Sequence, residues 1–432
     1  MSWFKMIRLG MLHVAVAISL VPITGVLNRI MIHELGIMAS VVAALIILPH
    51  LFSPIQVFIG QFSDRHPIGG YRRTPYIALG ILLCVIGAAL TPFAAFAMDA
   101  SFWPGLALAL LIFGMWGVGF NTAVVSYLSL ASDMSPAHLR SRTIAVMWFM
   151  MITAVIGTAI GAGRALEHYT PERLIEVFAI CASVALTIAT LGLIGLEPRN
   201  ATPVSHEERH SAVDSVRTVV ADPLARRFFI YLMLMLSAIL GQDVLLEPYG
   251  AAAFGMSVRE TTQLTATWGS ATLLALLLHG ILFSRWLSNK RGAMLGGAIA
   301  ATGLTLIALS GILRLQPLFV PAVAILGFGT GIATATNLAL MLDMTTPQQV
   351  GLFIGAWGVA DAAARGLGNL LAGMIRDLTA LVAGPTGSYA TVFLIEALIL
   401  GVALVMLRAI DVSAFRSQRR ELGQLVAVMG DA

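Results

Sequence analysis

Charged residues are scarce in this sequence: Asp, Glu, Lys and Arg together make up 11% of its 432 residues. Hydrophobic residues make up 58%, and the mean hydropathy is +0.89. No soluble globular class has this composition, whereas a membrane protein with many transmembrane helices does.

Cysteine is also scarce, and the two that occur, Cys84 and Cys181, both fall inside long apolar runs. Their positions offer neither a disulfide framework nor the spacing of metal ligands. The sequence has no P-loop, no dinucleotide-binding glycine pattern, no zinc spacing and no recognisable Ser, His and Asp set. We therefore predict no catalytic residues, no metal site and no covalently attached cofactor, which disfavours an enzyme.

Long apolar runs make up most of the chain. A bilayer span needs about 20 mostly apolar residues. Twelve such runs are present, at residues 9–32, 37–59, 76–98, 104–130, 142–162, 174–196, 228–248, 262–284, 292–313, 317–341, 351–374 and 389–408. The predicted fold class is therefore an all-α polytopic membrane protein with twelve transmembrane helices.

The two halves of the chain resemble each other. Asp133-Met-Ser-Pro136 follows the fourth run and Asp343-Met-Thr-Thr-Pro347 follows the tenth, and each precedes a glycine-rich run. Such duplication is typical of transporters built from two pseudo-symmetric six-helix halves. We predict an N-terminal half at 1–197, a cytoplasmic linker at 198–226, a C-terminal half at 227–410 and a cytoplasmic tail at 411–432. Apolar residues at helical spacing predict a short amphipathic helix at 211–220 in the linker.

The basic residues indicate the orientation. If both termini lie in the cytoplasm, the outer side holds only six of the 26 Lys and Arg residues: Arg29, Arg164, Arg173, Arg259, Arg314 and Arg376. The positive-inside rule favours this arrangement, so the basic pI gives no reason to expect nucleic acid as a partner.

The first run follows Lys5 and Arg8, is too long for a signal-peptide core and lacks a cleavage site, so we expect it to be retained as a span.

The loop between the second and third runs contains a glycine, an acid and an arginine cluster, namely Gly60, Asp64, Arg65, Arg72 and Arg73. A carboxylate beside arginines at a helix end can hold two helices together through charge-assisted hydrogen bonds. The order resembles the cytoplasmic signature loop of the major facilitator superfamily, with several extra residues between Arg65 and Arg72. The alternative is ordinary positive-inside charge with no further role.

Polar residues inside apolar runs are candidates to line a cavity, because a charge facing lipid is costly. Asp243 and Glu247 are four residues apart, which predicts that they share one helical face before Pro248 and Gly250 end the helix. Glu247 at the hydrated interface is the alternative. Asp361 and Arg365 are also four apart, and the pair is either purely structural or part of a cavity. The remaining candidates are Asn28, Arg29, Asn121, Asn337 and Glu396.

Three histidines occur on apolar helices: His13, His50 and His279. A neutral imidazole is a good axial ligand for the magnesium of a tetrapyrrole pigment. A buried histidine that bonds only to its protein neighbours is the simpler interpretation of each.

Three stretches together resemble the PucC/LhaA family of phototrophic bacteria, a branch of the major facilitator superfamily. They are 27–36, beginning Leu-Asn-Arg-Ile-Met; 63–77, ending Tyr-Arg-Arg-Thr-Pro-Tyr-Ile; and 242–264, beginning Gln-Asp-Val-Leu-Leu-Glu-Pro-Tyr-Gly. The resemblance extends over nearly the whole chain. The chain departs from the family at Asp361 and Arg365, because the span at 351–374 that contains them is usually uncharged in the family.

The resemblance implies an assembly factor for light-harvesting antenna complexes, in the cytoplasmic or intracytoplasmic photosynthetic membrane of a bacterium. Its implied partners are the lipid bilayer, antenna polypeptides and pigment-synthesis or reaction-centre proteins, with bacteriochlorophyll as bound cargo. Some members are labelled bacteriochlorophyll synthase chains. Two alternative functions stay open: a proton-linked transporter of a small anionic or pterin-like solute, and a tetrapyrrole-modifying enzyme.

Overall fold

The computed structural model describes residues 2–136, 139–199, 221, 223–283, 286–343 and 350–410. These residues are almost entirely helical and contain one isolated β-bridge. The predicted amphipathic helix at 211–220 and the tail at 411–432 lie outside this range. Within it, ten helices are long and apolar enough to cross a membrane. The all-α membrane class is therefore confirmed, and the count of twelve spans stays a prediction.

Contacts group the chain into two units. Unit 1 comprises Met1–Arg209, Gly241–Gly269 and Asn369–Tyr389, and unit 2 comprises His210–Leu240, Ser270–Gly368 and Ala390–Ala432. The predicted division at 198–226 stays a prediction, since most of that segment is outside the described residues.

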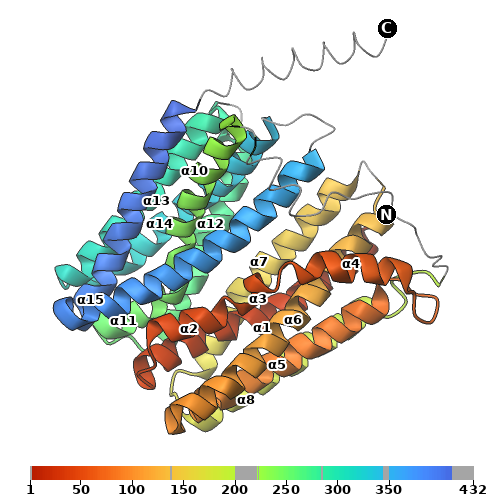
Figure 1. Cartoon of the computed structure of the whole chain (residues 1–432), viewed down its shortest axis with the longest axis horizontal. Coiled ribbons are helices and arrows are strands. Elements are labelled where there is room, and N and C mark those ends of the chain that lie inside the picture. Colours follow the sequence, from red (N-terminus) through yellow and green to blue (C-terminus); the bar gives the residue numbers. More distant parts are fainter. Residues whose placement is uncertain are drawn as a thin grey trace. The chain divides into compact units, whose positions relative to one another are not determined.

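Unit 1 contains most of the N-terminal helices, coloured red to yellow in Figure 1. In chain order these are α1 (Trp3–Val21), the π-helical segments η1 (Pro22–Leu27) and η2 (Ile30–Glu34), α2 (Ala39–Ile46), α3 (Leu48–Leu51), α4 (Ile55–Arg65), α5 (Thr74–Ala100), α6 (Phe102–Met134), α7 (Arg140–Ala165) and α8 (Pro171–Leu193). The 3₁₀ segment η4 (Gly241–Val244), α11 (Leu246–Phe254) and the first half of α12 (Val258–Ile281) complete it, together with part of α15 (Val350–Ala409).

Unit 2 contains α10 (Pro223–Leu240), the second half of α12, α13 (Asn289–Ile312), α14 (Gln316–Asp343) and the remaining parts of α15. α15 is interrupted at Gly384, where φ is 71° and ψ is 178°. Glycine is favoured here because this backbone conformation is strained for other residues.

Equivalent helix pairs pack closely in both units. In unit 1, α5 lies along α6, and in unit 2, α13 lies along α14 (Figure 1). A Cβ at Gly119 would overlap the backbone of Cys84 in α5, and one at Gly329 would overlap Ala300 in α13. Small residues thus let the helix backbones approach each other in the way expected for helices in lipid.

The second predicted span is broken into α2, α3 and α4. Pro49 lies in the first turn of α3, and Pro54 directly precedes α4. Proline lacks a backbone N–H and is tolerated at helix starts but not in helix interiors. The apolar run at 37–59 is thus not one straight helix.

Candidate functional site

The signature loop forms a tight turn between α4 and α5. Ile68 and Tyr71 exchange two backbone hydrogen bonds of 2.9 and 3.0 Å, and the residues between them, Gly69 and Gly70, have φ of 60° and 82°. A two-residue turn with both central φ values positive strongly favours Gly-Gly. This turn accommodates residues that the superfamily signature lacks.

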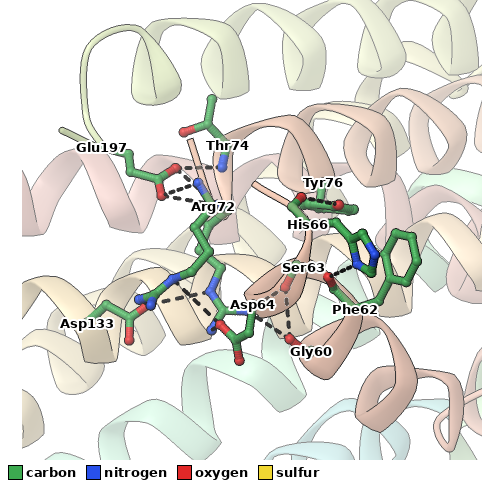
Figure 2. A network of polar contacts seen from close by, with 11 residues as sticks. Gly60, Phe62, Ser63, Asp64, His66, Arg72, Thr74, Tyr76, Asp133 and Glu197 are labelled. Carbon is green, nitrogen blue, oxygen red and sulfur yellow. Dashed lines mark hydrogen bonds and ion pairs between the residues drawn. The ribbon is translucent and has the colours of Figure 1, made fainter. Parts of the chain in front are cut away.

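A buried ion-pair network extends from this loop (Figure 2). Asp64 at the end of α4 is 2% exposed and pairs with Arg73, which is 3% exposed, and more distantly with Arg72 at 3.5 Å. Arg73 also donates to Ser63 Oγ at 2.5 Å and to the Gly60 carbonyl at 3.2 Å. The structure thus brings together four of the five predicted loop residues, while Arg65 is exposed.

Two further carboxylates complete the network. Asp133, at the end of α6, accepts from Arg72 at 2.6 Å. Glu197, which follows α8, accepts from the backbone N–H groups of Arg72 at 2.9 Å, Arg73 at 3.0 Å and Thr74 at 2.7 Å. Figure 2 shows its carboxylate facing the start of α5. Glu197 therefore caps a helix that has no side-chain cap of its own.

Sequence reasoning did not select Asp133 or Glu197 as site residues. The sequence indicates these two acids only weakly. Each follows the predicted cytoplasmic end of an apolar run, on the same side of the membrane as the basic loop. With the two acids included, the network connects α4, α5, α6 and the end of α8 within unit 1.

A second polar cluster lies at the crossing of the first and seventh spans, also within unit 1. We call it the junction; it comprises Gly25, Asn28, Arg29, Gln242, Val244, Glu247 and Thr265. Asn28 Nδ2 donates to the Val244 carbonyl at 2.7 Å, and Thr265 Oγ1 donates to Glu247 Oε1 at 2.6 Å. Asn28 and Glu247 are 0% and 2% exposed, which places both side chains in the protein interior rather than at a hydrated interface.

Arg29 ties the junction to the segment beyond α11. Its guanidinium donates to the Met256 carbonyl at 3.0 Å and to Glu34 Oε1 at 2.9 Å. Because Arg29 is 4% exposed, these bonds and its ion pair offset the cost of burying its charge.

The prediction that Asp243 and Glu247 share one helical face was wrong. Asp243 belongs to the 3₁₀ segment η4, and α11 begins at Leu246. Pro248 does not end a helix, because it lies in the first turn of α11, where its missing N–H costs nothing. α11 instead ends before Gly255, which has φ of 65° and provides the left-handed C-cap.

The other predicted polar residues do not join these clusters. Asn121 accepts from Gln56 at 2.6 Å and donates to the Pro49 carbonyl at 2.7 Å, so it bonds a carbonyl at the break in the second span. In unit 2, buried Asn337 accepts from the Tyr231 hydroxyl at 2.8 Å. The predicted polar residues of α15 are the ion pair of Asp361 with Arg365, at 3.1 Å, and the buried Glu396.

The three histidines occupy different settings. His13 is buried, with the rings of Tyr127 and Trp148 at centroid distances of 5.3 Å each. His279 is buried and His50 is half-buried. A role of any of them as a pigment ligand stays a prediction. Across the described residues, no group of three or more His, Cys, Asp or Glu side chains is placed to hold a metal ion.

Unit 2 also holds a hydrophobic cavity of about 200 Å³. It lies between α13, α14 and the segment that follows α12. Its lining is entirely hydrophobic and includes three aromatic rings: Phe283, Trp286, Leu287, Leu295, Ile299, Phe328 and Ile332. Trp286 is 82% exposed, so the cavity opens at the surface of this unit beside an aromatic side chain.

Comparison with known proteins identifies similar sequences over nearly the full length. A family profile described as PUCC protein matches residues 26–415. The chain is 33% identical over 429 residues to Protein PucC of Cereibacter sphaeroides, covering 96% of this chain and 94% of that protein. It is 29% identical over 414 residues to a protein of Rhodobacter capsulatus named Bacteriochlorophyll synthase 44.5 kDa chain, covering 94% and 95%.

Solved structures with a similar fold are transporters. A bacterial homologue of the human lysosomal transporter Spinster matches with a TM-score of 0.71 at 15% identity, covering 96% of this chain and 98% of that one. The nucleoside transporter NupG matches with a TM-score of 0.70 at 14% identity, covering 94% and 99%. At such low identity these matches show the fold alone, which this chain shares with these transporters.

Proposed function

The chain belongs to the PUCC protein family, and we propose that it is an integral membrane assembly factor for light-harvesting antenna complexes that handles bacteriochlorophyll. The family match over residues 26–415 carries this proposal. The name of the Rhodobacter capsulatus relative, which mentions bacteriochlorophyll synthase, agrees with a connection to that pigment. We infer that the protein is not itself an enzyme, in keeping with its transporter fold.

The cavity of unit 2 supports a role with an apolar ligand. A pigment carrier needs a hydrophobic surface that accepts part of the pigment from the bilayer, and a cavity of about 200 Å³ suits part of a hydrocarbon tail rather than the ring system. The lining of Phe283, Trp286 and Phe328 offers such a surface without any polar side chain. Ligand pockets are predominantly hydrophobic and aromatic in this way.

The first experiment is deletion of the gene in its phototrophic host, followed by near-infrared absorption spectroscopy of the membranes. We expect antenna absorbance to fall and to return when the wild-type gene is supplied. Unchanged antenna spectra and antenna polypeptide levels after deletion would refute the proposal.

Pigment handling is tested separately from assembly. We expect the mildly solubilised, affinity-purified protein to carry a bacteriochlorophyll band. Leu295→Trp, which fills the cavity, should reduce that band, whereas Leu313→Trp, at an exposed position after α13, should not. A colourless protein that still co-purifies antenna polypeptides would leave assembly without pigment carriage.

A transporter of a small anionic or pterin-like solute is the second candidate. The observation in its favour is the polar junction between two broken helices, because discontinuous helices form substrate and ion sites in secondary transporters. Proton-linked uptake into liposomes that is lost in Asp243→Asn would support it. Absence of uptake across a broad solute panel would argue against it.

We propose an inner-membrane location with both termini in the cytoplasm, supported by the distribution of Lys and Arg. Reporter fusions at each terminus and in the loop at residues 166–170 test this orientation. A loop reporter active on the cytoplasmic side would contradict it.

A further inference from the structure

Among the buried junction atoms that have no hydrogen-bond partner, acceptors outnumber donors. Asn28 Oδ1, Gln242 Oε1 and Glu247 Oε2 are all buried, and none has a hydrogen-bond partner among the described residues. The three side chains are 0%, 2% and 2% exposed. Buried polar atoms are almost always paired, because an unpaired one loses its bonds to water without compensation.

Neighbouring donors do not remove this surplus. Glu247 Oε1 already accepts from Thr265, and Gln242 Nε2 donates to Asp243 at 2.6 Å. The Nε of Arg29 is also buried without a partner, but the other two nitrogens of its guanidinium bond to Glu34 and to the Met256 carbonyl. Three unpartnered acceptor atoms therefore stand against one unpartnered donor atom, which belongs to a guanidinium group held elsewhere.

The acceptors flank one crossing of two chain segments. Asn28 bonds to the Val244 carbonyl, and Gly25, three residues before Asn28, lies against Glu247, three residues after Val244. A Cβ at residue 25 would lie 2.7 Å from Glu247 Oε1, so only glycine allows the carboxylate this close. The two segments thus cross in antiparallel register.

Both segments are irregular at this crossing. The first span changes from α-helix to the π-helical segment η1 at Pro22, and the seventh changes to the 3₁₀ segment η4 at Gly241. Departures from regular α-helix often mark functional positions, and broken helices in membrane proteins are tolerated where they line a site.

We propose that the junction binds one monovalent cation, either a proton carried by Glu247 or a sodium ion. Oxygen acceptors are the ligands that a sodium ion uses, and a proton on the carboxyl group would supply the missing donor. Glu247, the carboxylate among the junction residues, contributes one negative charge, which suits a monovalent ion. The Asp243 carboxylate accepts from Gln242, and Arg29 is paired with Glu34. This inference does not depend on the proposed assembly function.

Binding there would fasten the first span to the seventh, because the cation would bond to side chains of both. The charged groups on the surrounding segments are Arg29 and Glu34 on the first span and Asp243 on the seventh, while α12 contributes Thr265. His33 lies 3.5 Å from Glu34, so it needs its own control.

The test measures thermal unfolding of the purified full chain in detergent. One series varies sodium chloride against N-methylglucamine chloride at constant ionic strength and fixed pH. A second series lowers the pH from about 8 to about 6 without sodium. We expect the Tm to rise with sodium if sodium is the ligand, or with falling pH if it is the proton, since the form that binds the ligand is stabilised.

Glu247→Gln should abolish the response in either case, because it removes the negative charge and adds an amide donor of similar shape. Glu176→Gln, at an exposed position of α8, and His33→Gln should retain it. A Tm that responds to neither sodium nor pH, or a response that persists in Glu247→Gln, would overturn the proposal.

Infrared spectroscopy of the wild-type protein gives a second test if Glu247→Gln does not fold. A protonated carboxylic acid band in sodium-free buffer, shifted in D₂O, supports the proton, and sodium-dependent changes in carboxylate bands support sodium. Spectra with neither feature would refute both.

Discussion

Removal of the Glu197 carboxylate should weaken the start of α5, although Glu197 is remote from that helix in the sequence. α5 begins at Thr74 without a side-chain cap from its own segment and without an acid in its first turn. Glu197 supplies both from 123 residues away, through bonds of 2.7 to 3.0 Å to three backbone N–H groups. Glu197→Ala leaves all three donors dependent on water.

The magnitude follows from two contributions. Loss of a capping side chain costs about 0.5–2 kcal/mol. Loss of a negative charge at a helix N-terminus costs a further 0.3–1 kcal/mol, roughly. We therefore expect Glu197→Ala to destabilise the protein by about 1–3 kcal/mol. Glu197→Gln should cost less, because one acceptor oxygen remains while the charge is lost.

The assay is thermal unfolding in detergent, read as a rank order because unfolding of membrane proteins is commonly irreversible. Glu176→Ala is the matched control, since it removes an exposed glutamate from α8. We expect the Tm to decrease in the order wild type and Glu176→Ala, then Glu197→Gln, then Glu197→Ala. Equal Tm values for the two alanine variants would refute the capping argument.

Three other substitutions test the packing and charge arguments in the same assay. Asp64→Asn should cost less than the roughly 3–5 kcal/mol of a fully unpaired buried charge, because it removes the nearer carboxylate of buried Arg73 and leaves only Asp133, at 3.4 Å. Restored stability in a double variant with Arg73→Met is the check. Gly25→Ala should cost about 1–3 kcal/mol through overlap with a carboxylate oxygen, whereas Gly157→Ala, with open space at its Cβ, should be neutral. Asp377→Ala should cost about 0.5–2 kcal/mol, because that carboxylate caps α2, and an unchanged Tm would contradict this role.

Much of the fold was predictable because the membrane imposes a simple pattern. Apolar runs long enough to span a bilayer identify helices without knowledge of their packing. The loop from Gly60 to Arg73 was also predictable, since its charges follow a known order, and the structure places Asp64 beside both arginines. The ion pair of Asp361 with Arg365 follows directly from their helical spacing.

Helix irregularity was harder to predict. The apolar run at 228–248 predicts one regular helix, and a regular helix would place Asp243 and Glu247 on a common face. The structure changes geometry at Gly241 and starts a new helix at Leu246, so the two residues belong to different helical segments. Pro248 marked the region correctly as irregular, but proline is equally compatible with a helix start and a helix end, and its position alone does not distinguish them.

Two long-range helix caps explain why the site was only partly visible in the sequence. Glu197 caps α5, and Asp377 accepts from Ala39 N at 3.1 Å and Ser40 N at 2.8 Å at the start of α2. Neither helix has a side-chain cap from its own N-cap residue. Capping rules search the residues next to a helix start, so an acid more than 100 positions away gives no signal. Because each cap connects distant segments, loss of either carboxylate would free a helix end from a neighbouring segment as well as expose its N–H groups. The acids at these helix ends therefore determine how the spans of unit 1 are held together, while the apolar runs determine only that the spans exist.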